Sequence, residues 1–146
     1  MRLDAGESRR RFAAAGVARL ATADGEGRPH LVPVTFALPG TDAIAIGIDD
    51  KPKSTRDLRR LRNIAANPRV ALLADHYDDD WTRLWWARAD GEARILAEGP
   101  AHATAWNLLR ARYPQLGTHP AQGPIIWITV DKWTGWSYTS QPEAPR

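Results

Sequence analysis

Cysteine is absent from the 146-residue sequence, and methionine occurs once. The lack of cysteine excludes disulfide bonds, thiolate metal ligands and a cysteine nucleophile, and it agrees with a reducing cytoplasm. Long apolar runs are also lacking, since Ala43–Ile48 and Gly123–Ile128 are far too short to span a bilayer. The chain turns polar within Met1–Glu7, which is untypical of a signal peptide. We therefore expect a soluble, cytoplasmic protein without a membrane partner.

Metal-site and hydrolase motifs are missing as well. No two of the four histidines have the spacing of a His-Glu-x-x-His motif, and the acidic run Asp78–Asp80 lacks the EF-hand pattern. Neither a Gly-x-Ser-x-Gly motif nor a Walker-type glycine-rich loop occurs. The sequence predicts no metal site and identifies no catalytic residue.

What is present has the composition of an ordinary globular domain, with 43% hydrophobic and 25% charged residues. The length fits a single domain. We expect this domain to cover residues 1–140, and the polar segment 141–146 to be a disordered tail. A net charge of +3 does not demand a nucleic-acid partner. The four arginines of one predicted helix keep that alternative open but weak: Arg56, Arg59, Arg60 and Arg62.

Alternation of apolar and polar residues predicts a mainly β (α+β) fold. Its strands are expected at Val17–Ala23, Pro29–Leu38, Ala43–Asp49, Arg69–Tyr77, Leu84–Glu98, Pro124–Asp131 and Gly135–Thr139. The Asp24–Gly27 turn indicates a hairpin, and Asp90-Gly91 indicates a bulge. Because closure removes exposed strand edges, six or seven antiparallel strands of this kind predict a small barrel.

Two or three short helices accompany these strands. They are expected at Glu7–Ala15, Thr55–Ala66 and Ala101–Tyr113. The second has the clearest signals, since Ser54 and Asp57 form a capping-box pattern and Asn67-Pro68 stops the helix.

A basic turn precedes this second helix. A helix N-terminus offers free backbone N–H groups and the positive end of the helix dipole. Cations and hydroxyls at such a position are typical of a phosphate site. The residues concerned are Lys51, Pro52, Lys53, Ser54, Thr55 and Arg56. The alternative is a capped surface helix with solvated basic neighbours, and the carboxylate of Asp57 would compete with a bound anion.

Two strands carry features of a shallow groove for a planar ring. Small residues, Ala45 and Gly47, line one face of the third strand. The second strand places His30, Val32, Val34 and Phe36 on one face and Pro33 on the other. The alternative, which these residues favour when taken alone, is tight packing between strands.

Seven tryptophans are a high number for this length. Trp85 and Trp86 are adjacent in one predicted strand, so they point to opposite faces. We expect most tryptophans to fill the core and one of this pair to face a ligand or a partner subunit.

Several weak motifs in a fixed order resemble the split β-barrels related to pyridoxamine phosphate oxidase. They are Val17–Thr22, Gly27–Val34, Lys51–Leu58, Asn67–Val70, Trp81–Trp86 and Trp133–Ser137. Within that family the chain is most similar to the actinobacterial branch that uses the deazaflavin coenzyme F420. The resemblance implies an FMN-binding split-barrel fold and a homodimer with two cofactor sites at the subunit interface.

The resemblance also implies roles for individual residues. Lys51, Lys53, Ser54, Thr55 and Arg56 would bind the cofactor phosphate. Strand residues would border the ring: His30, Val32, Pro33, Val34 and Ile48. Trp85 and Trp86 would come from the opposite subunit. The basic turn departs from the relatives, because its two lysines flank a proline, and the lysine that meets the phosphate stays open.

A reduced deazaflavin donates a hydride, so the resemblance implies reduction of a small unsaturated or quinone-like compound. No side chain is required for that transfer, although His30, His76 and Tyr77 are candidate proton donors. Relatives that oxidise vitamin B6 carry an arginine-rich C-terminal segment, whereas residues 133–138 here contain no arginine. FMN in place of F420, or a cofactor-binding protein without turnover, are the alternatives.

Overall fold

The computed structural model describes residues 1–48, 55–117 and 123–139. Within these ranges the chain forms one eight-stranded sheet and three α-helices. The strands are β1 (Arg2–Leu3), β2 (Ala18–Ala23), β3 (Pro29–Val34), β4 (Ala37–Gly40), β5 (Ala43–Gly47), β6 (Arg69–His76), β7 (Trp85–Leu96) and β8 (Ile125–Ser137). The helices are α1 (Ala5–Ala14), α2 (Thr55–Ala66) and α3 (Pro100–Arg112), and short 3-10 turns follow β6 and α3.

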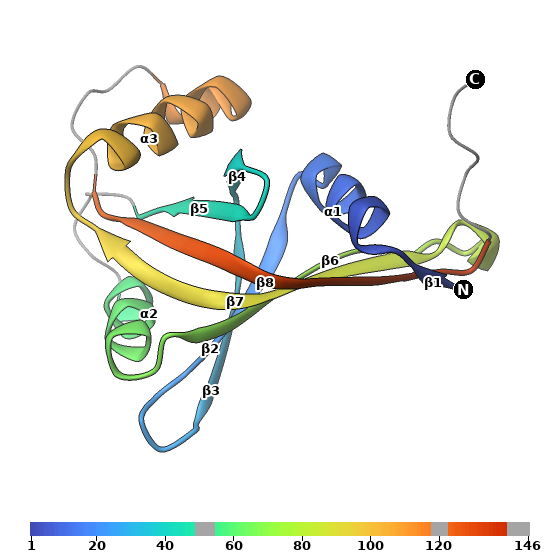
Figure 1. The fold of residues 1–146 in the computed structure, drawn as a ribbon, viewed down its shortest axis with the longest axis horizontal. Coiled ribbons are helices and arrows are strands. Elements are labelled where there is room, and N and C mark those ends of the chain that lie inside the picture. Colours follow the sequence, from blue (N-terminus) through green and yellow to red (C-terminus); the bar gives the residue numbers. More distant parts are fainter. Residues whose placement is uncertain (49–54, 118–122, 140–146) are drawn as a thin grey trace.

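The sheet runs in the order β3-β2-β6-β7-β8-β5-β4, with β1 paired to β8 outside this path. All of its neighbouring strands are antiparallel. The long strands β7 and β8 form the central ribbon (Figure 1). Among the described residues β3 and β4 are the two free edges, so the sheet is not closed. The predicted mainly β split-barrel fold is confirmed, with eight strands in place of six or seven because the short β1 was missed.

The strand predicted at Pro29–Leu38 is in fact two strands on opposite edges of the sheet. β3 pairs with β2, and β4 pairs with β5. Between them the backbone N–H of Phe36 donates to the hydroxyl of Tyr113 at 3.2 Å instead of to a neighbouring strand. The connection therefore crosses from one edge to the other, and the turn between β4 and β5 lies at Thr41 and Asp42.

The two strands predicted at the C-terminal end are one continuous strand, β8. Its pairing with β7 shifts register once, since Asp90 lies opposite Lys132 and Gly91 opposite Val130, leaving Asp131 as the extra residue. The irregularity predicted at Asp90-Gly91 is therefore confirmed as a bulge. A side chain at position 91 would lie 2.2 Å from the carbonyl oxygen of Thr129, so this position requires glycine.

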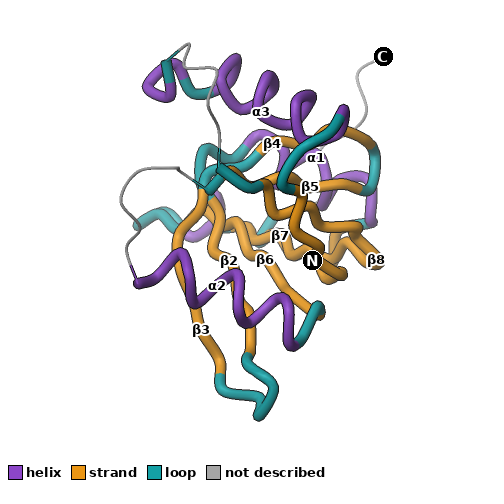
Figure 2. The backbone as a smooth tube through the Cα atoms, turned by 90° about the vertical axis from the view of Figure 1, so that its left-hand side faces the viewer, coloured by secondary structure: helices purple, strands orange, loops and turns teal. Residues whose placement is uncertain are grey.

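The buried hydrophobic side chains form two cores. The main core lies inside the curved sheet, where Phe12 of α1 and Ile64 of α2 pack against strand residues such as Leu20, Ile46 and Ile128. The smaller core lies between α3 and the β4–β5 edge. Figure 2 shows α2 near β2 and β3, and α3 on the far side of the sheet beside β4 and β5. None of the described helices is long and apolar enough to cross a bilayer.

Candidate functional site

Strand β3 supplies the first group of predicted site residues. His30, Val32 and Val34 alternate along its inner side, and Pro33 points outward. Val34 is buried in the main core, whereas His30 and Val32 are half-buried at the edge of the sheet. Because β3 has no further strand beside it among the described residues, this edge also presents unpaired backbone groups.

The second group surrounds the start of α2. Ile48 is buried, and its backbone N–H donates to the carbonyl of Pro124 at 2.9 Å. Lys51, Lys53 and Ser54 lie outside the described residues. Thr55 and Arg56 begin the twelve-residue helix α2. The backbone N–H groups of that first turn have no partners within the helix, which is the property that favours an anion.

The proposed groove beside Ala45 and Gly47 is occupied by the chain itself. A side chain at position 47 would lie 2.5 Å from the indole of Trp106, so the tryptophan of α3 packs directly on this backbone. The indole N–H of Trp106 donates to the carbonyl of Gly123 at 3.0 Å. The expectation of space for a planar ring here is wrong, and the alternative of tight packing holds. Sequence periodicity could not show that α3 covers this strand.

Trp85 and Trp86 lie on opposite faces of β7, as their adjacency predicts. Trp85 packs against the main core, with the guanidinium of Arg11 5.9 Å from its ring centroid. Trp86 lies on the outer face, where the guanidinium of Arg88 is 5.7 Å from its ring centroid. A single copy of the chain therefore cannot present both indoles to the same side of the sheet.

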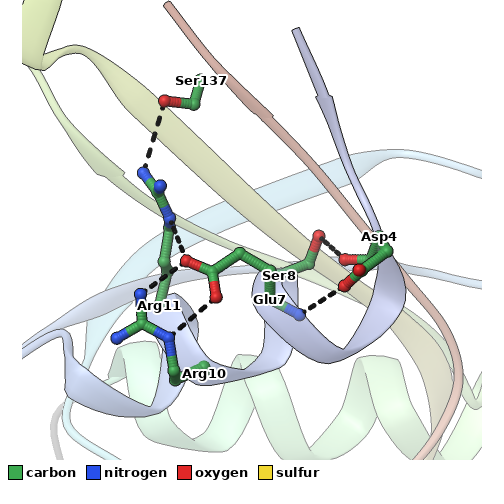
Figure 3. A network of polar contacts seen from close by, with 6 residues as sticks. All are labelled: Asp4, Glu7, Ser8, Arg10, Arg11 and Ser137. Atoms are coloured by element: carbon green, nitrogen blue, oxygen red, sulfur yellow. Dashed lines mark hydrogen bonds and ion pairs between the residues drawn. The ribbon is translucent and has the colours of Figure 1, made fainter. Parts of the chain in front are cut away.

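Arg11 is held by a polar network at the start of α1 (Figure 3). Its Nε donates to the carboxylate of Glu7 at 2.9 Å, and its Nη1 lies 3.4 Å from the hydroxyl of Ser137. The same carboxylate accepts two hydrogen bonds from Arg10. The hydrogen bond from Arg10, together with that from Arg11, lowers the pKa of Glu7 to about 2. Glu7 therefore stays ionised and fixes the guanidinium beside Trp85.

The candidate proton donors are not gathered at one place. His30 lies opposite Thr22 in β3, at the other end of the sheet from the last residue of β6, His76. The Nε2 of His76 is 3.5 Å from the carboxylate of Asp78, and Tyr77 is exposed. In the part of the chain that the structure describes, no group of three or more His, Asp or Glu side chains is placed to hold a metal ion.

The outer face of the sheet carries a shallow cavity that the sequence analysis missed. Its volume is about 330 Å³, and it is lined by Leu73, Asp75, Tyr77, Trp86 and Arg88. The available signal was the two-residue period of β6, which places Leu73 on the same face as two polar positions. An apolar residue on an otherwise polar strand face is a mark of a contact surface.

Sequence comparison gives the family. The pattern of the pyridoxamine 5'-phosphate oxidase family matches residues 5–137 of the chain. The chain belongs to this family. The match covers β2 to β8 and all three helices, so every described strand except β1 lies within the region that matches the family. No curated protein sequence matches at a significant level.

Solved structures show the same fold at low sequence identity. An FAD-binding protein of Mesorhizobium loti superimposes with a TM-score of 0.70 and 22% identity, over 92% of this chain and 93% of that one. A candidate 5-nitroimidazole antibiotic resistance protein of Bacteroides thetaiotaomicron gives 0.73 and 15%, over 92% and 86%. The heme storage protein of Vibrio cholerae gives 0.66 and 16%, over 90% of each chain. The fold thus serves proteins named for different ligands.

The described residues fit a flavin-type cofactor of this family in part. The half-buried His30 and Val32 leave side-chain surface accessible beside the free backbone edge of β3. Val34 and Ile48, the other apolar residues predicted to border the ring, are buried. The helix start at Thr55 follows in the chain after Ile48, where an anionic phosphate would be favoured.

Proposed function

We propose that this chain is an F420-dependent reductase of the pyridoxamine 5'-phosphate oxidase family, acting in the cytoplasm as a homodimer. The observation that carries the proposal is the pairing of two features within the family fold. One is the half-buried inner side of the edge strand β3, with His30 and Val32. The other is helix α2, which begins at Thr55, directly after a sequence segment that contains Lys51 and Lys53.

The two features divide the recognition of the cofactor. Lys51, Lys53, Ser54, Thr55 and Arg56 would hold its phosphate through charge-assisted hydrogen bonds and the helix N-terminus. His30 and Val32 would lie along the ring, and the free backbone edge of β3 would meet polar atoms of the ring. Pro33 contributes no backbone N–H to that edge. The FAD-binding protein of Mesorhizobium loti supports a flavin-type ring on this fold.

When bound, the reduced coenzyme supplies a hydride, so the protein has to bind, orient and exclude water. The substrate class we propose is a small unsaturated or quinone-like compound that accepts this hydride. Vitamin B6 phosphate is a poor candidate substrate, because residues 133–138 contain no arginine for its phosphate. His30 is the candidate donor nearest the proposed ring position, since it belongs to β3 itself.

The first test is a titration of the purified protein with coenzyme F420, FMN and hemin, followed by quenching of tryptophan fluorescence. We expect F420 to bind with the highest affinity. Preference for FMN would keep the site and change the cofactor. Preference for hemin would favour the role of the Vibrio cholerae relative. If no ligand binds with a dissociation constant below about 0.1 mM, which corresponds to a binding free energy of about −5.5 kcal/mol, the proposal fails.

The phosphate site is tested by a triple substitution, Lys51→Ala with Lys53→Ala and Arg56→Ala. Loss of charge-assisted hydrogen bonds should raise the dissociation constant of F420 at least about a hundredfold. The matched control removes three exposed cations from nearby positions: Arg28→Ala, Arg59→Ala and Arg62→Ala. Equal weakening by both triple variants would mean that general attraction by positive charge, and not the turn, holds the cofactor.

Turnover separates an enzyme from a cofactor-binding protein without catalysis. The assay follows oxidation of reduced F420 by its absorbance while quinones and activated alkenes are supplied in turn. We expect at least one of these classes to be reduced at a rate that depends on the protein. Tight binding of F420 with no turnover of any of them would favour the carrier or sensor alternative.

A homodimer is part of the proposal because the two indoles of Trp85 and Trp86 lie on opposite faces of β7. Trp86 faces away from the inner side of β3, so it can approach the proposed ring position only from a second copy of the chain. A cofactor site between two subunits would therefore combine β3 and the basic turn of one copy with Trp86 of the other.

A further inference from the structure

A polar cluster lies under helix α1, at the end of the ribbon where β6 finishes and β7 begins. His76 lies opposite Trp85, and Trp85 lies opposite Ser137, so the three residues form one row across β6, β7 and β8. Residues directly opposite one another in antiparallel strands point to the same face. Helix α1 contacts all three strands, and its Arg11 lies over the Trp85 ring. We call Arg11 and this row the ribbon-end cluster.

Arg11 is held in place and largely shielded from water. Only 13% of its side chain is exposed, and 10% of that of Glu7. The carboxylate of Glu7 accepts from Nε at 2.9 Å, and the hydroxyl of the buried Ser137 lies 3.4 Å from Nη1 (Figure 3). A guanidinium presents five N–H donors in a fixed planar fork. These two contacts therefore leave donors of Arg11 for a further group.

Unused donors lie beside the indole of Trp85. Among the described residues, neither Nη2 of Arg11 nor the indole N–H of Trp85 makes a hydrogen bond. The guanidinium is 5.9 Å from the ring centroid, and the indole is half-buried. The side chain of His76, the cross-strand neighbour of Trp85, is 48% exposed. Nitrogen-bearing groups of α1, β6 and β7 thus lie around one accessible indole.

The charges around this indole favour an anion. The charged residues of α1 and its N-cap are three cations and two anions: Asp4, Glu7, Arg9, Arg10 and Arg11. The single charge of Glu7 is shared between two arginines, so it leaves an excess of positive charge on the helix. On the strand side, the carboxylate of Asp78 lies 3.5 Å from His76 and 3.8 Å from Arg83, which compensates it.

A guanidinium binds a carboxylate through charge-assisted hydrogen bonds, and an indole packs favourably on another aromatic ring. We propose that the ribbon-end cluster binds a small aromatic carboxylate. Arg11 binds its carboxylate group, and the accessible part of Trp85 packs on its ring. The site is distinct from the proposed cofactor site, because His30 lies at the other end of the sheet from His76. The inference therefore does not depend on the proposed function.

The probe for this site is benzoate, and benzamide is its uncharged counterpart of similar shape. The indole N–H region of a ¹H–¹⁵N spectrum gives one signal for each tryptophan, and Trp85→Phe identifies the signal of Trp85 by its loss. Benzoate should shift this signal with a dissociation constant of about 1 mM or less, and benzamide should bind at least about tenfold more weakly. The absence of any shift up to about 10 mM benzoate would overturn the inference.

Two arginines of the same helix provide a matched pair of variants. Both donate to Glu7, but the side chain of Arg10 is 63% exposed and that of Arg11 only 13%. Arg11→Gln should weaken benzoate binding at least about tenfold, whereas Arg10→Gln should change it by less than about twofold. Equal weakening by both would mean that general positive charge attracts benzoate, which would overturn the site.

A second substitution guards against loss of folding in Arg11→Gln. Arg11→Lys keeps the cation but loses the planar fork, so it should also weaken benzoate binding while Arg10→Lys should not. Thermal unfolding without ligand shows that each variant is folded. Folded Arg11→Lys and Arg11→Gln proteins that bind benzoate like wild type would contradict the assignment.

Titration of the same samples with F420 keeps this result separate from the proposed function. Wild-type protein that binds benzoate at Trp85 but binds neither F420 nor FMN would retain the ribbon-end site and remove the reductase proposal. Wild-type protein that binds F420 but not benzoate would mean that Glu7 and Arg11 only fix α1 on the sheet, and it would overturn the inference.

Discussion

At the scale of single residues, Gly47 decides how closely α3 approaches the sheet. A Cβ atom added at position 47 would lie only 2.5 Å from the indole ring of Trp106. Gly47→Ala should therefore overpack the smaller core and lower the free energy of unfolding by about 1–3 kcal/mol. Chemical denaturation measures this change.

The control for that substitution is Gly40→Ala at the end of the neighbouring strand β4, where nothing lies within 4 Å of the added Cβ. Its effect should stay within about 0.5 kcal/mol, as for other surface changes. An equal loss in both variants would mean that backbone flexibility, and not the contact with Trp106, sets the cost.

Glu7 makes a second prediction at this scale. Its pKa of about 2 in the folded protein lies below its ordinary value of 4.5, chiefly because Arg10 donates hydrogen bonds to it. A lowered pKa adds stability that is fully present above pH 4.5 and is lost as the pH falls toward 2. The substitution Glu7→Gln removes this pH-dependent stabilisation.

We expect Glu7→Gln to lower the free energy of unfolding at neutral pH by about 1.5–3 kcal/mol, the range for hydrogen bonds to charged groups. The difference from wild type should shrink as the pH falls from about 4.5 toward 2, because Glu7 of the unfolded chain binds a proton in this range whereas Glu7 of the folded chain stays ionised until about pH 2. Urea denaturation of both proteins across this range measures the effect. A difference that stays constant with pH would show that the charge of Glu7 contributes nothing.

At the scale of elements, Tyr113 joins three segments that are distant in sequence. Its hydroxyl accepts from the N–H of Phe36 at 3.2 Å and lies 3.1 Å from the carbonyls of both Phe36 and Gly16. Arg112 also donates to the Phe36 carbonyl, at 3.3 Å. The end of α3 thereby fixes the crossing between β3 and β4 and the segment after α1.

Tyr113→Phe should lower the free energy of unfolding by about 1–3 kcal/mol, because it leaves the N–H of Phe36 without its acceptor. Tyr138→Phe is the control, since Tyr138 is half exposed and its hydroxyl can exchange partners with water. Thermal unfolding of the two variants gives the comparison. Equal stabilities would mean that Arg112 alone holds the crossing.

The same contact explains which elements the sequence could predict. The bounds of α2 agree with the prediction of Thr55–Ala66, because Asn67-Pro68 and the helical apolar stripe act locally. The break between β3 and β4 depends on Tyr113, 77 residues away, so no local signal announces it. The continuity of β8 likewise appears only in its pairing with β7, which runs past Gly135 to Ser137.

The candidate site divides in the same way. The opposite faces of Trp85 and Trp86 follow from strand alternation, which is a local rule. Two other features depend on which elements are neighbours in the fold. They are the packing of Trp106 on Gly47 and the set of side chains that share the outer face of β2, β6 and β7. Sequence patterns therefore predict which face of a strand a side chain occupies. The tertiary arrangement decides which residues that face contacts.

At the scale of the whole molecule, the proposed cofactor site combines residues of two copies, which makes it testable by mixing. One variant carries the triple substitution of Lys51, Lys53 and Arg56 by alanine. The other carries Trp86→Leu, which keeps an apolar side chain on the outer face. Each variant alone should bind F420 weakly, because every site in it lacks one component.

Co-expression of the two variants should recover binding. In a mixed dimer, one site receives both substitutions and the other receives neither. Random pairing makes about half of the dimers mixed, so about one quarter of all sites should regain wild-type affinity. Fluorescence titration of the purified mixture counts these sites. If no high-affinity sites return although the mixed dimer is present, Trp86 and the basic turn do not meet across the interface. In that case a cofactor bound by the turn would lie wholly within one copy of the chain.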